Sequence, residues 1–237
     1  MSSIADNIES VTRRIQKATL QAGREPGSVR LLAVSKTRPP EDLLAATQAG
    51  QMAFGENYVQ EALDKMTALN AVEGIEWHFI GPIQSNKTRQ IAESFSWVHS
   101  VDRLKIARRL SEQRPKSLGP LNLCLQVNVN SEDTKSGCSL AELPELAAAI
   151  GELPNLNLRG LMAIPDPDQS EAELRKSFRQ LANALTDLKE KYPEAGQFDT
   201  LSMGMSDDLE AAIAEGATWV RVGSALFGNR PTKQSQS

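Results

Sequence analysis

The sequence has few residues of the kinds that form disulfides or bind transition metals. Its 237 residues include two cysteines, Cys124 and Cys138, and two histidines, His78 and His99. Cys124 lies in an apolar run and Cys138 in a polar segment, and their spacing matches no metal-binding motif. This composition excludes a disulfide framework. We expect both thiols and His99 to have structural roles.

The sequence also lacks long hydrophobic runs and any excess of positive charge. No apolar stretch approaches the roughly 20 residues of a membrane span, and residues 1–7 do not resemble a signal peptide. Lysine and arginine total 26 against 30 acidic residues, so the net charge is −4 and the pI is near 5.4. These features predict a cytoplasmic protein that binds neither membrane nor nucleic acid. The polar residues 231–237 are expected to form a disordered tail.

Short apolar runs alternate with segments of helical periodicity along the whole chain. The predicted strands cover 30–36, 51–54, 76–80, 97–100, 121–129, 157–164, 199–203 and 218–222. Eight such units without a linker predict an α/β protein with a single (β/α)8 TIM barrel over residues 1–230. A doubly wound open sheet is the alternative. An extra helix, about 4–22, covers the barrel or replaces its last outer helix.

Lys36 ends the first predicted strand and precedes a Pro-rich turn. The carboxyl ends of strands carry the ligand sites of α/β folds. A partly desolvated lysine favours its neutral form, and a neutral amine can attack an aldehyde to form a Schiff base. The alternative is a structural lysine at a strand end with its ammonium in solvent.

Residues after the last two predicted strands are suited to binding a phosphate. Gly204-Met205-Ser206 precedes a predicted helix, and Gly223-Ser224 follows the eighth strand. Together they supply backbone N–H groups and two hydroxyls, where this fold often binds phosphate. The alternative is an ordinary helix cap at Ser206 and a turn glycine.

Alternation along the strands predicts which side chains face the barrel interior. Arg221 and Gly223 are two residues apart and so point to the same face. An inward arginine needs a partner, either a pyridine nitrogen or a carboxylate. His78 lies opposite Trp77 and Phe79, so a hydrogen-bonded interior histidine is favoured over a general base.

Several sequence blocks together resemble a known family. They are Ala33–Thr37, Phe54–Glu61, Trp77–Gly81, Gln84–Lys87, Gly160–Met162, Leu201–Asp208 and Val220–Gly223. These blocks span nearly the whole chain and closely resemble the pyridoxal phosphate homeostasis protein family, of the YggS type. The resemblance implies a barrel similar to the N-terminal domain of alanine racemase.

The resemblance also implies roles for individual residues toward pyridoxal 5′-phosphate. Lys36 would hold it covalently as a Schiff base, and Arg221 would meet the pyridine nitrogen. The family often has threonine where this chain has Ser224, and serine keeps the hydroxyl. The remaining implied contacts are to the phosphate (Ser206, Gly223, Ser224), to the ring faces (Asn57, Met162) and nearby (His78, Ser202).

Two functions follow from this resemblance. One is a non-catalytic, monomeric pyridoxal phosphate carrier that serves pyridoxal-phosphate-dependent apoenzymes in vitamin B6 homeostasis. The other is a racemase-like enzyme. The cationic Arg221 disfavours protonation of the pyridine nitrogen and weakens the electron sink. Alanine racemase has a similar arginine but takes its second base from an additional C-terminal domain, which we expect to be missing. The carrier is therefore favoured.

Lys135 in the loop after the fifth strand could reach an anionic ligand, although a solvated lysine is the commoner case.

Overall fold

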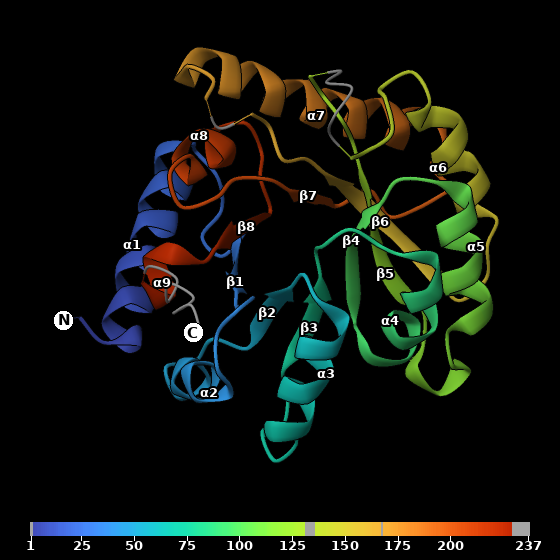
Figure 1. Ribbon diagram of the computed structural model, residues 1–237. Helices are drawn as coiled ribbons and strands as arrows, with labels where there is room; N and C mark the ends of the chain where they lie inside the picture. Colours follow the sequence, from blue (N-terminus) through green and yellow to red (C-terminus); the bar gives the residue numbers. More distant parts are fainter. Residues whose placement is uncertain (1, 131–135, 167, 229–237) are drawn as a thin grey trace, which may run out of the picture.

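Eight parallel strands form one closed barrel (Figure 1). The computed structural model describes residues 2–130, 136–166 and 168–228. Each strand pairs with the next, and β8 closes the barrel on β1. The predicted TIM barrel is confirmed and the open sheet was wrong. The strands are β1 (Arg30–Val34), β2 (Ala53–Glu56), β3 (Glu76–Phe79), β4 (Trp97–Val101), β5 (Leu121–Gln126), β6 (Leu156–Met162), β7 (Thr200–Ser202) and β8 (Trp219–Val222).

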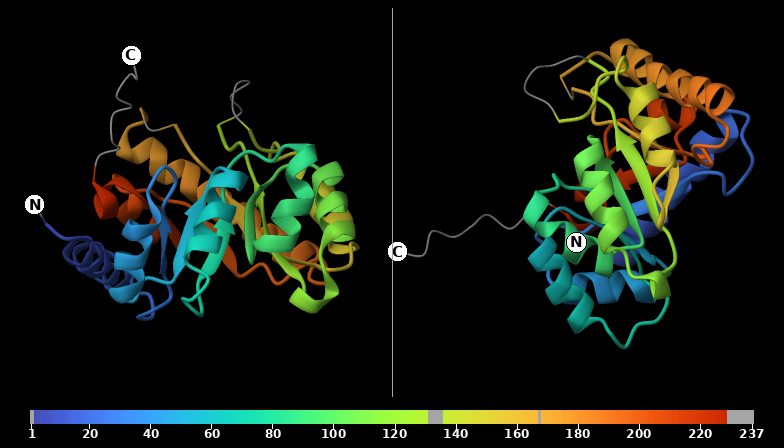
Figure 2. Two further views of the ribbon diagram at one scale, coloured as in Figure 1. Left: turned by 60° about the horizontal axis from the view of Figure 1, so that its bottom comes forward. Right: turned by 90° about the vertical axis from the view of Figure 1, so that its right-hand side faces the viewer.

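Helices surround the barrel and join successive strands (Figures 1 and 2). Their sequences are amphipathic, so one side packs on the strands and the other faces solvent. In chain order they are α1 (Ile4–Gln21), α2 (Pro40–Gln48), α3 (Val59–Ala68), η1 (Ser85–Lys87), α4 (Thr88–Ser94), α5 (Leu104–Gln113), η2 (Lys116–Leu118), α6 (Leu143–Gly151), α7 (Glu171–Lys191), α8 (Leu209–Ala214) and α9 (Ser224–Phe227). None of the helices in the described ranges combines the length and hydropathy needed to cross a bilayer.

The predicted extra helix α1 takes the place of the last outer helix. The Ser3 side chain caps its start, in a reciprocal arrangement with Asp6. Its buried face packs against α2, α8 and α9. Because α9 has only four residues, α1 supplies most of the cover on that side of the barrel (Figure 1).

Apolar side chains are divided between two compartments. The main cluster lies between strands and helices and includes Ala33, Phe54 and Phe79. Two small clusters lie apart from it, one containing Leu32, Ala53 and Trp219, the other Trp97, Cys124 and Met162. Adjacent residues such as Leu32 and Ala33 fall in different compartments, as strand alternation requires. The small clusters therefore fill the barrel interior. Cys124 and Cys138 are free thiols, in line with the expected absence of a disulfide framework, and both are buried, although Cys138 was expected in a polar segment.

Several predicted boundaries were wrong by a few residues. β1 ends at Val34, so Lys36 lies in the following turn, where Thr37 adopts a positive φ of 64°. β5 ends at Gln126 rather than 129, and Val127 makes an isolated bridge to Cys138. The predicted tail 231–237 and Lys135 lie outside the described residues.

Candidate functional site

A cavity of about 280 Å³ opens at the carboxyl ends of the strands. It contains six of the nine residues predicted to bind the cofactor, because the turns after β1, β2, β7 and β8 converge there. The three others, His78, Met162 and Ser202, do not line it. The lining residues are Val34, Lys36, Arg38, Asn57, Ile80, Ile164, Met205, Ser206, Asp207, Arg221, Gly223, Ser224 and Gly228.

Lys36 is half-buried, and both of its neighbours are fixed by a buried cluster. The ammonium of Lys65 lies 2.7 Å from the Ser35 carbonyl oxygen, 2.7 Å from Glu56 Oε1 and 2.6 Å from Glu61 Oε1. The Ser35 hydroxyl donates to Glu56 Oε1, and the Thr37 N–H donates to Glu61 Oε1. The backbone on either side of Lys36 is therefore held by α3.

The charges of this cluster are closely coupled. Burial raises the pKa of the Glu56 carboxyl, and the Lys65 ammonium acts against that shift. Glu56 is fully buried, and its Oε2 has no hydrogen-bond partner among the residues that the structure describes. Lys65 is itself 2% exposed. Each charge thus depends on the other to remain buried.

Arg221 extends from β8 beneath the cavity, on the same face as Gly223, as predicted. Its hydrogen-bond partners are neutral: Nη1 donates to Ser202 Oγ at 2.9 Å and Nη2 to the Ala163 carbonyl oxygen at 2.9 Å. Burial lowers the pKa of Arg221 to about 10, partly opposed by Asp208. Arg221 therefore remains a cation at neutral pH and can face a ligand atom that accepts hydrogen bonds.

Two hydroxyls face each other across the other side of the cavity. Ser206 follows β7 and Ser224 begins α9, and their Oγ atoms are 3.4 Å apart. The prediction that Ser206 caps a helix was wrong, because α8 begins only at Leu209. Instead the Asp208 carboxylate accepts from the Met205 N–H and closes the turn. With the Gly223 backbone at the start of α9, the two hydroxyls can bind a phosphate.

The three predicted residues outside the cavity are all fully buried in the barrel interior below it. Met162 packs with Trp97 and Cys124. Ser202 accepts from Arg221 and contacts His99. His78 contacts His99 and Glu76, as expected of a hydrogen-bonded interior histidine. Their predicted contacts with the cofactor stay predictions.

Sequence reasoning missed several cavity residues. Arg38 donates to the Gly228 carbonyl oxygen and lies over the Phe227 ring, 5.9 Å from its centroid. The position of Arg38, two residues after Lys36 in the same turn, could have predicted that it lines the cavity. Ile80 and Ile164 supply apolar walls, and their positions just after β3 and β6 were the corresponding signal.

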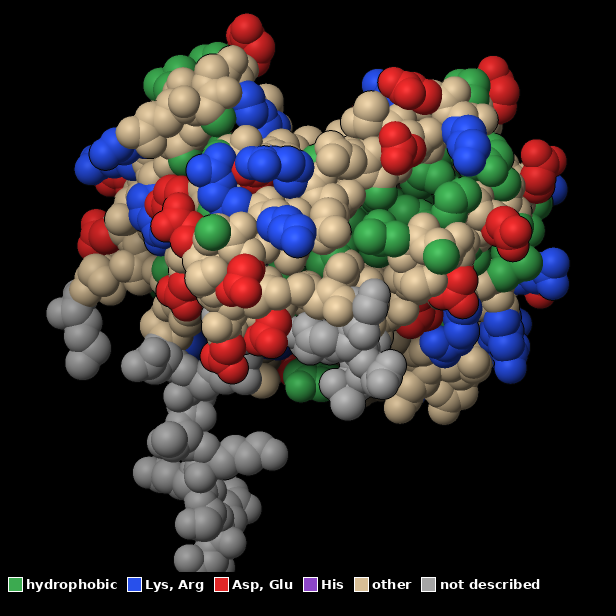
Figure 3. All heavy atoms as spheres, turned by 90° about the horizontal axis from the view of Figure 1, so that it is seen from above, with side chains coloured by type: hydrophobic (Ala, Val, Ile, Leu, Met, Phe, Trp, Pro, Cys, Tyr) green, Lys and Arg blue, Asp and Glu red, His purple; other side chains and the backbone are tan. Residues whose placement is uncertain are grey.

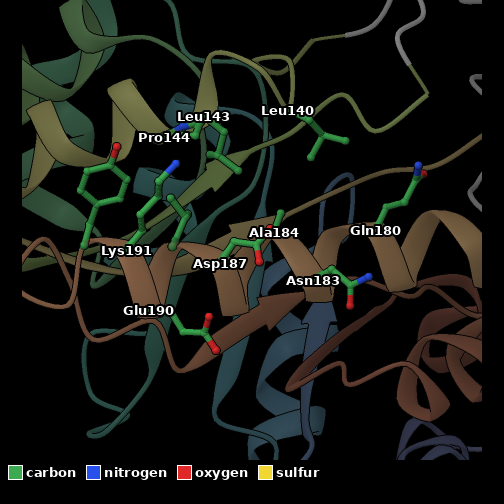
Figure 4. Close-up of a pocket in the computed structure, with 11 residues that line it drawn as sticks. Leu140, Leu143, Pro144, Gln180, Asn183, Ala184, Asp187, Glu190 and Lys191 are labelled. Atoms are coloured by element: carbon green, nitrogen blue, oxygen red, sulfur yellow. The ribbon is translucent and has the colours of Figure 1, made fainter.

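A second cavity, of about 580 Å³, lies on the outside of the barrel between α6 and α7 (Figure 4). Figure 3 shows apolar side chains gathered on part of the α7 face. Leu140, Leu143 and Leu188 line this cavity together with polar residues of α7. Although it is larger, we assign the functional site to the cavity at the strand ends, because buried charge and hydroxyls converge only there among these two. Within the described ranges, no group of three or more His, Cys, Asp or Glu residues could hold a metal ion.

Comparisons with known proteins agree with this geometry. Residues 3–231 match the family described as alanine racemase, N-terminal domain. The chain is 61% identical over 230 residues to the pyridoxal phosphate homeostasis protein of Pseudomonas aeruginosa, covering 97% of both chains. It belongs to the pyridoxal phosphate homeostasis protein family. The Escherichia coli K12 member is 53% identical over 232 residues, covering 97% of this chain and 98% of that protein.

Solved structures of the family have the same fold. PipY of Synechococcus elongatus, with pyridoxal phosphate bound, aligns with a TM-score of 0.83 and 37% identity, covering 95% of this chain and all of PipY. Its structure without the cofactor aligns with a TM-score of 0.85 and 38% identity, at the same coverage. Alanine racemase of Corynebacterium glutamicum shares the fold, with a TM-score of 0.70 and 17% identity over 97% of this chain and 62% of that enzyme.

Proposed function

We propose that this protein binds pyridoxal 5′-phosphate at the strand-end cavity and acts in the homeostasis of that cofactor. The observation that carries the proposal is the convergence of Lys36, Arg221 and the Ser206–Ser224 hydroxyl pair on one cavity. An amine, a hydrogen-bond donor and a phosphate site are the groups that an aldehyde, a pyridine nitrogen and a phosphate require. The names of the relatives and the cofactor in PipY support the same ligand.

The residues present fit the cofactor in further respects. The Asn57 Oδ1 atom is buried without a hydrogen-bond partner among the described residues, so the site has an unused acceptor. Ile80 and Ile164 offer apolar surface to a ring. The lysine, the guanidinium and the hydroxyls are contributed by different turns, so a ligand that contacts all three would be fixed in orientation.

Lys36 is the residue proposed to hold the cofactor covalently. Its amine, in the neutral form, would condense with the aldehyde, losing its two hydrogens with the carbonyl oxygen as water and leaving a C=N bond. The cluster of Lys65, Glu56 and Glu61 orients this residue by fixing Ser35 and Thr37. Ser206, Gly223 and Ser224 would hold the phosphate.

The protein is proposed to bind the cofactor without catalytic turnover. Bound pyridoxal phosphate can withdraw electrons from a substrate carbon, and it does so most strongly when its ring nitrogen is protonated. Arg221 is a buried cation that donates to its neighbours, so a proton on the facing nitrogen would meet like charge. Delivery to apoenzymes, a monomeric state and a cytoplasmic location are part of the same proposal.

Titration with pyridoxal phosphate tests the binding. The full-length protein should develop a Schiff-base absorbance band that Lys36→Ala abolishes and that Lys17→Ala, at an exposed position of α1, leaves unchanged. A band that persists in Lys36→Ala would refute the covalent assignment. Incubation of the loaded protein with alanine and other amino acids should give no sustained product. Steady racemisation over many turnovers would instead favour the racemase-like alternative.

A further inference from the structure

A continuous series of hydrogen bonds, buried except at its half-buried Glu76 end, crosses the barrel interior below the cavity. It runs from Glu76 to Arg221, and we call these five side chains the interior network. The steps are Glu76 Oε1 to His78 Nε2 (2.8 Å), His78 Nδ1 to His99 Nε2 (2.8 Å), His99 Nδ1 to Ser202 Oγ (2.7 Å) and Ser202 Oγ to Arg221 Nη1 (2.9 Å). The network thus connects the amino end of β3 to the guanidinium under the cavity.

The chemistry of its two ends fixes the order of the protons. The Glu76 carboxylate can only accept, so His78 must donate to it from Nε2. With both rings neutral, His78 Nδ1 then accepts from His99 Nε2–H, and His99 Nδ1 accepts from the Ser202 hydroxyl. Arginine can only donate, so Ser202 Oγ accepts from Arg221. Every contact is satisfied by one arrangement, with both histidines in the Nε2–H form.

The surroundings of His78 and His99 favour the neutral form of both imidazole rings. Both histidines are fully buried, and the His78 ring stacks on Trp97 and meets Trp219 edge-on. Burial lowers the pKa of His78, with Glu76 acting against it and Arg30 with it. Burial also lowers the pKa of His99, and His78 and Arg221 lower it further. The hydrogen bond from His78 is the largest cause that lowers the pKa of Glu76, which keeps this end ionised.

We propose that His99 and His78 are positioning residues for Arg221. Through Ser202 they present one oriented acceptor to the guanidinium, and the Glu76 carboxylate fixes that orientation from the far end of the network. Aligned hydrogen bonds polarise one another. The Glu76 carboxylate therefore stabilises the Arg221 guanidinium through the network, although Arg221 itself contacts only the Ser202 hydroxyl and the Ala163 carbonyl oxygen. This inference rests on the proposed function where it concerns the cofactor, because Arg221 is the group that would meet the pyridine nitrogen.

The proton order can be tested without cofactor. The chain has only two histidines, so a nitrogen-15 spectrum of the untagged, histidine-labelled protein contains only the two network rings. At pH 7 both should show a protonated Nε2 and an unprotonated, hydrogen-bonded Nδ1. An imidazolium, or an Nδ1–H form at either ring, would overturn the proposed order.

Variants test the positioning of Arg221. Ser202→Ala should weaken pyridoxal phosphate binding roughly tenfold and shift the pH dependence of its absorbance, because Arg221 loses a hydrogen bond to its charged group. His99→Leu should act in the same direction, because it removes the acceptor that orients the Ser202 hydroxyl. His99→Gln can accept at Oε1 and donate at Nε2, so it should restore most of the affinity. Ser111→Ala is the matched control, because it removes a buried serine that donates to the Pro154 carbonyl oxygen, away from the network.

The results separate this inference from the proposed function. Wild-type affinity and spectrum in Ser202→Ala and His99→Leu would overturn the positioning role, even if pyridoxal phosphate binds normally. Equal losses in Ser111→Ala would also contradict it, because they would reflect general destabilisation. If the wild type does not bind pyridoxal phosphate but its two rings show the expected protonation, the proposed function fails and the interior network stands.

Discussion

The ammonium of Lys65 lies 2.7 Å from the backbone carbonyl oxygen of Ser35, the residue that precedes Lys36. A fully buried lysine on α3 therefore fixes the turn that presents the proposed Schiff-base lysine. The same ammonium pairs with Oε1 of Glu56, whose Oε2 has no hydrogen-bond partner in the described part of the chain. The positions of the two lysines are thus linked through one carbonyl group.

Lys65→Met should destabilise the protein strongly. It leaves the Glu56 carboxylate buried without its cation, which typically costs about 3–5 kcal/mol. The free energy of unfolding in urea measures this loss. Lys65→Met combined with Glu56→Gln should recover part of it, and Lys17→Met on the exposed face of α1 should change little. An unfolding free energy equal to that of the wild type would mean that the cluster is not needed.

The pH dependence of stability should report the two histidines. Their pKa values are lowered in the folded protein by burial, while Glu76 faces His78, and His78 and Arg221 face His99. The unfolded chain therefore binds more protons below about pH 6.5, so their contribution is complete above that pH and is lost as the pH falls. Each can contribute a slope of up to about 1.4 kcal/mol per pH unit.

Urea unfolding at pH 7.5 and 5.5 measures this effect. Burial raises the pKa of the Glu56 and Asp208 carboxyls, so the folded protein binds protons at these two groups before the unfolded chain does. They therefore add stability as the pH falls, opposite to the two histidines. The comparison with His99→Gln isolates the histidine contribution, because only one titrating ring remains. The loss of stability on acidification should be smaller in the variant. The same loss in both proteins would contradict the depressed pKa of His99.

Gly204→Ala should destabilise the turn that carries Ser206. Gly204 has a φ of 94°, and an added Cβ would lie 2.6 Å from the Ala212 Cβ. Gly50→Ala is a close control, because its φ is 89° but nothing lies within 4 Å of the added atom. Backbone strain alone should cost about 1 kcal/mol in Gly50→Ala, and Gly204→Ala should lose about 1–3 kcal/mol more. Equal losses in urea unfolding would show that Ala212 moves aside freely.

Arg221→Glu should alter the bound cofactor's spectrum if Arg221 faces the pyridine nitrogen. A carboxylate there favours a protonated nitrogen, whereas the cation disfavours it. The absorbance of the loaded variant and its pH titration measure the change, with Arg221→Gln as the neutral comparison. A spectrum and affinity like those of the wild type in both variants would place Arg221 away from the ring.

The architecture could be predicted because its signals are local. Eight apolar runs with helical segments between them indicate the barrel, and strand alternation places Arg221 and Gly223 on one face. The ends of the strands were harder to predict, because whether the last residues of a strand are extended depends on hydrogen bonding to the neighbouring strand. β1 stops at Val34 because the chain then turns through Thr37.

The buried networks could not be predicted, because they join residues distant in the sequence. His78 and His99 are 21 residues apart, and Ser202 is a further 103 away. Their contact depends on the stagger of β3, β4 and β7, which a single sequence does not reveal. Strand alternation does place His78 toward the interior, but its hydrogen-bond partners are set only by the assembled barrel.

Reductive trapping tests the central claim most directly. The full-length protein, incubated with pyridoxal phosphate and then borohydride, should carry one stable label at Lys36 by peptide mass mapping. Lys36→Ala should carry none at that peptide, and Lys65 should stay unlabelled in both because its ammonium is buried and engaged. A label on another lysine, or no label in the wild type, would contradict the assignment of Lys36.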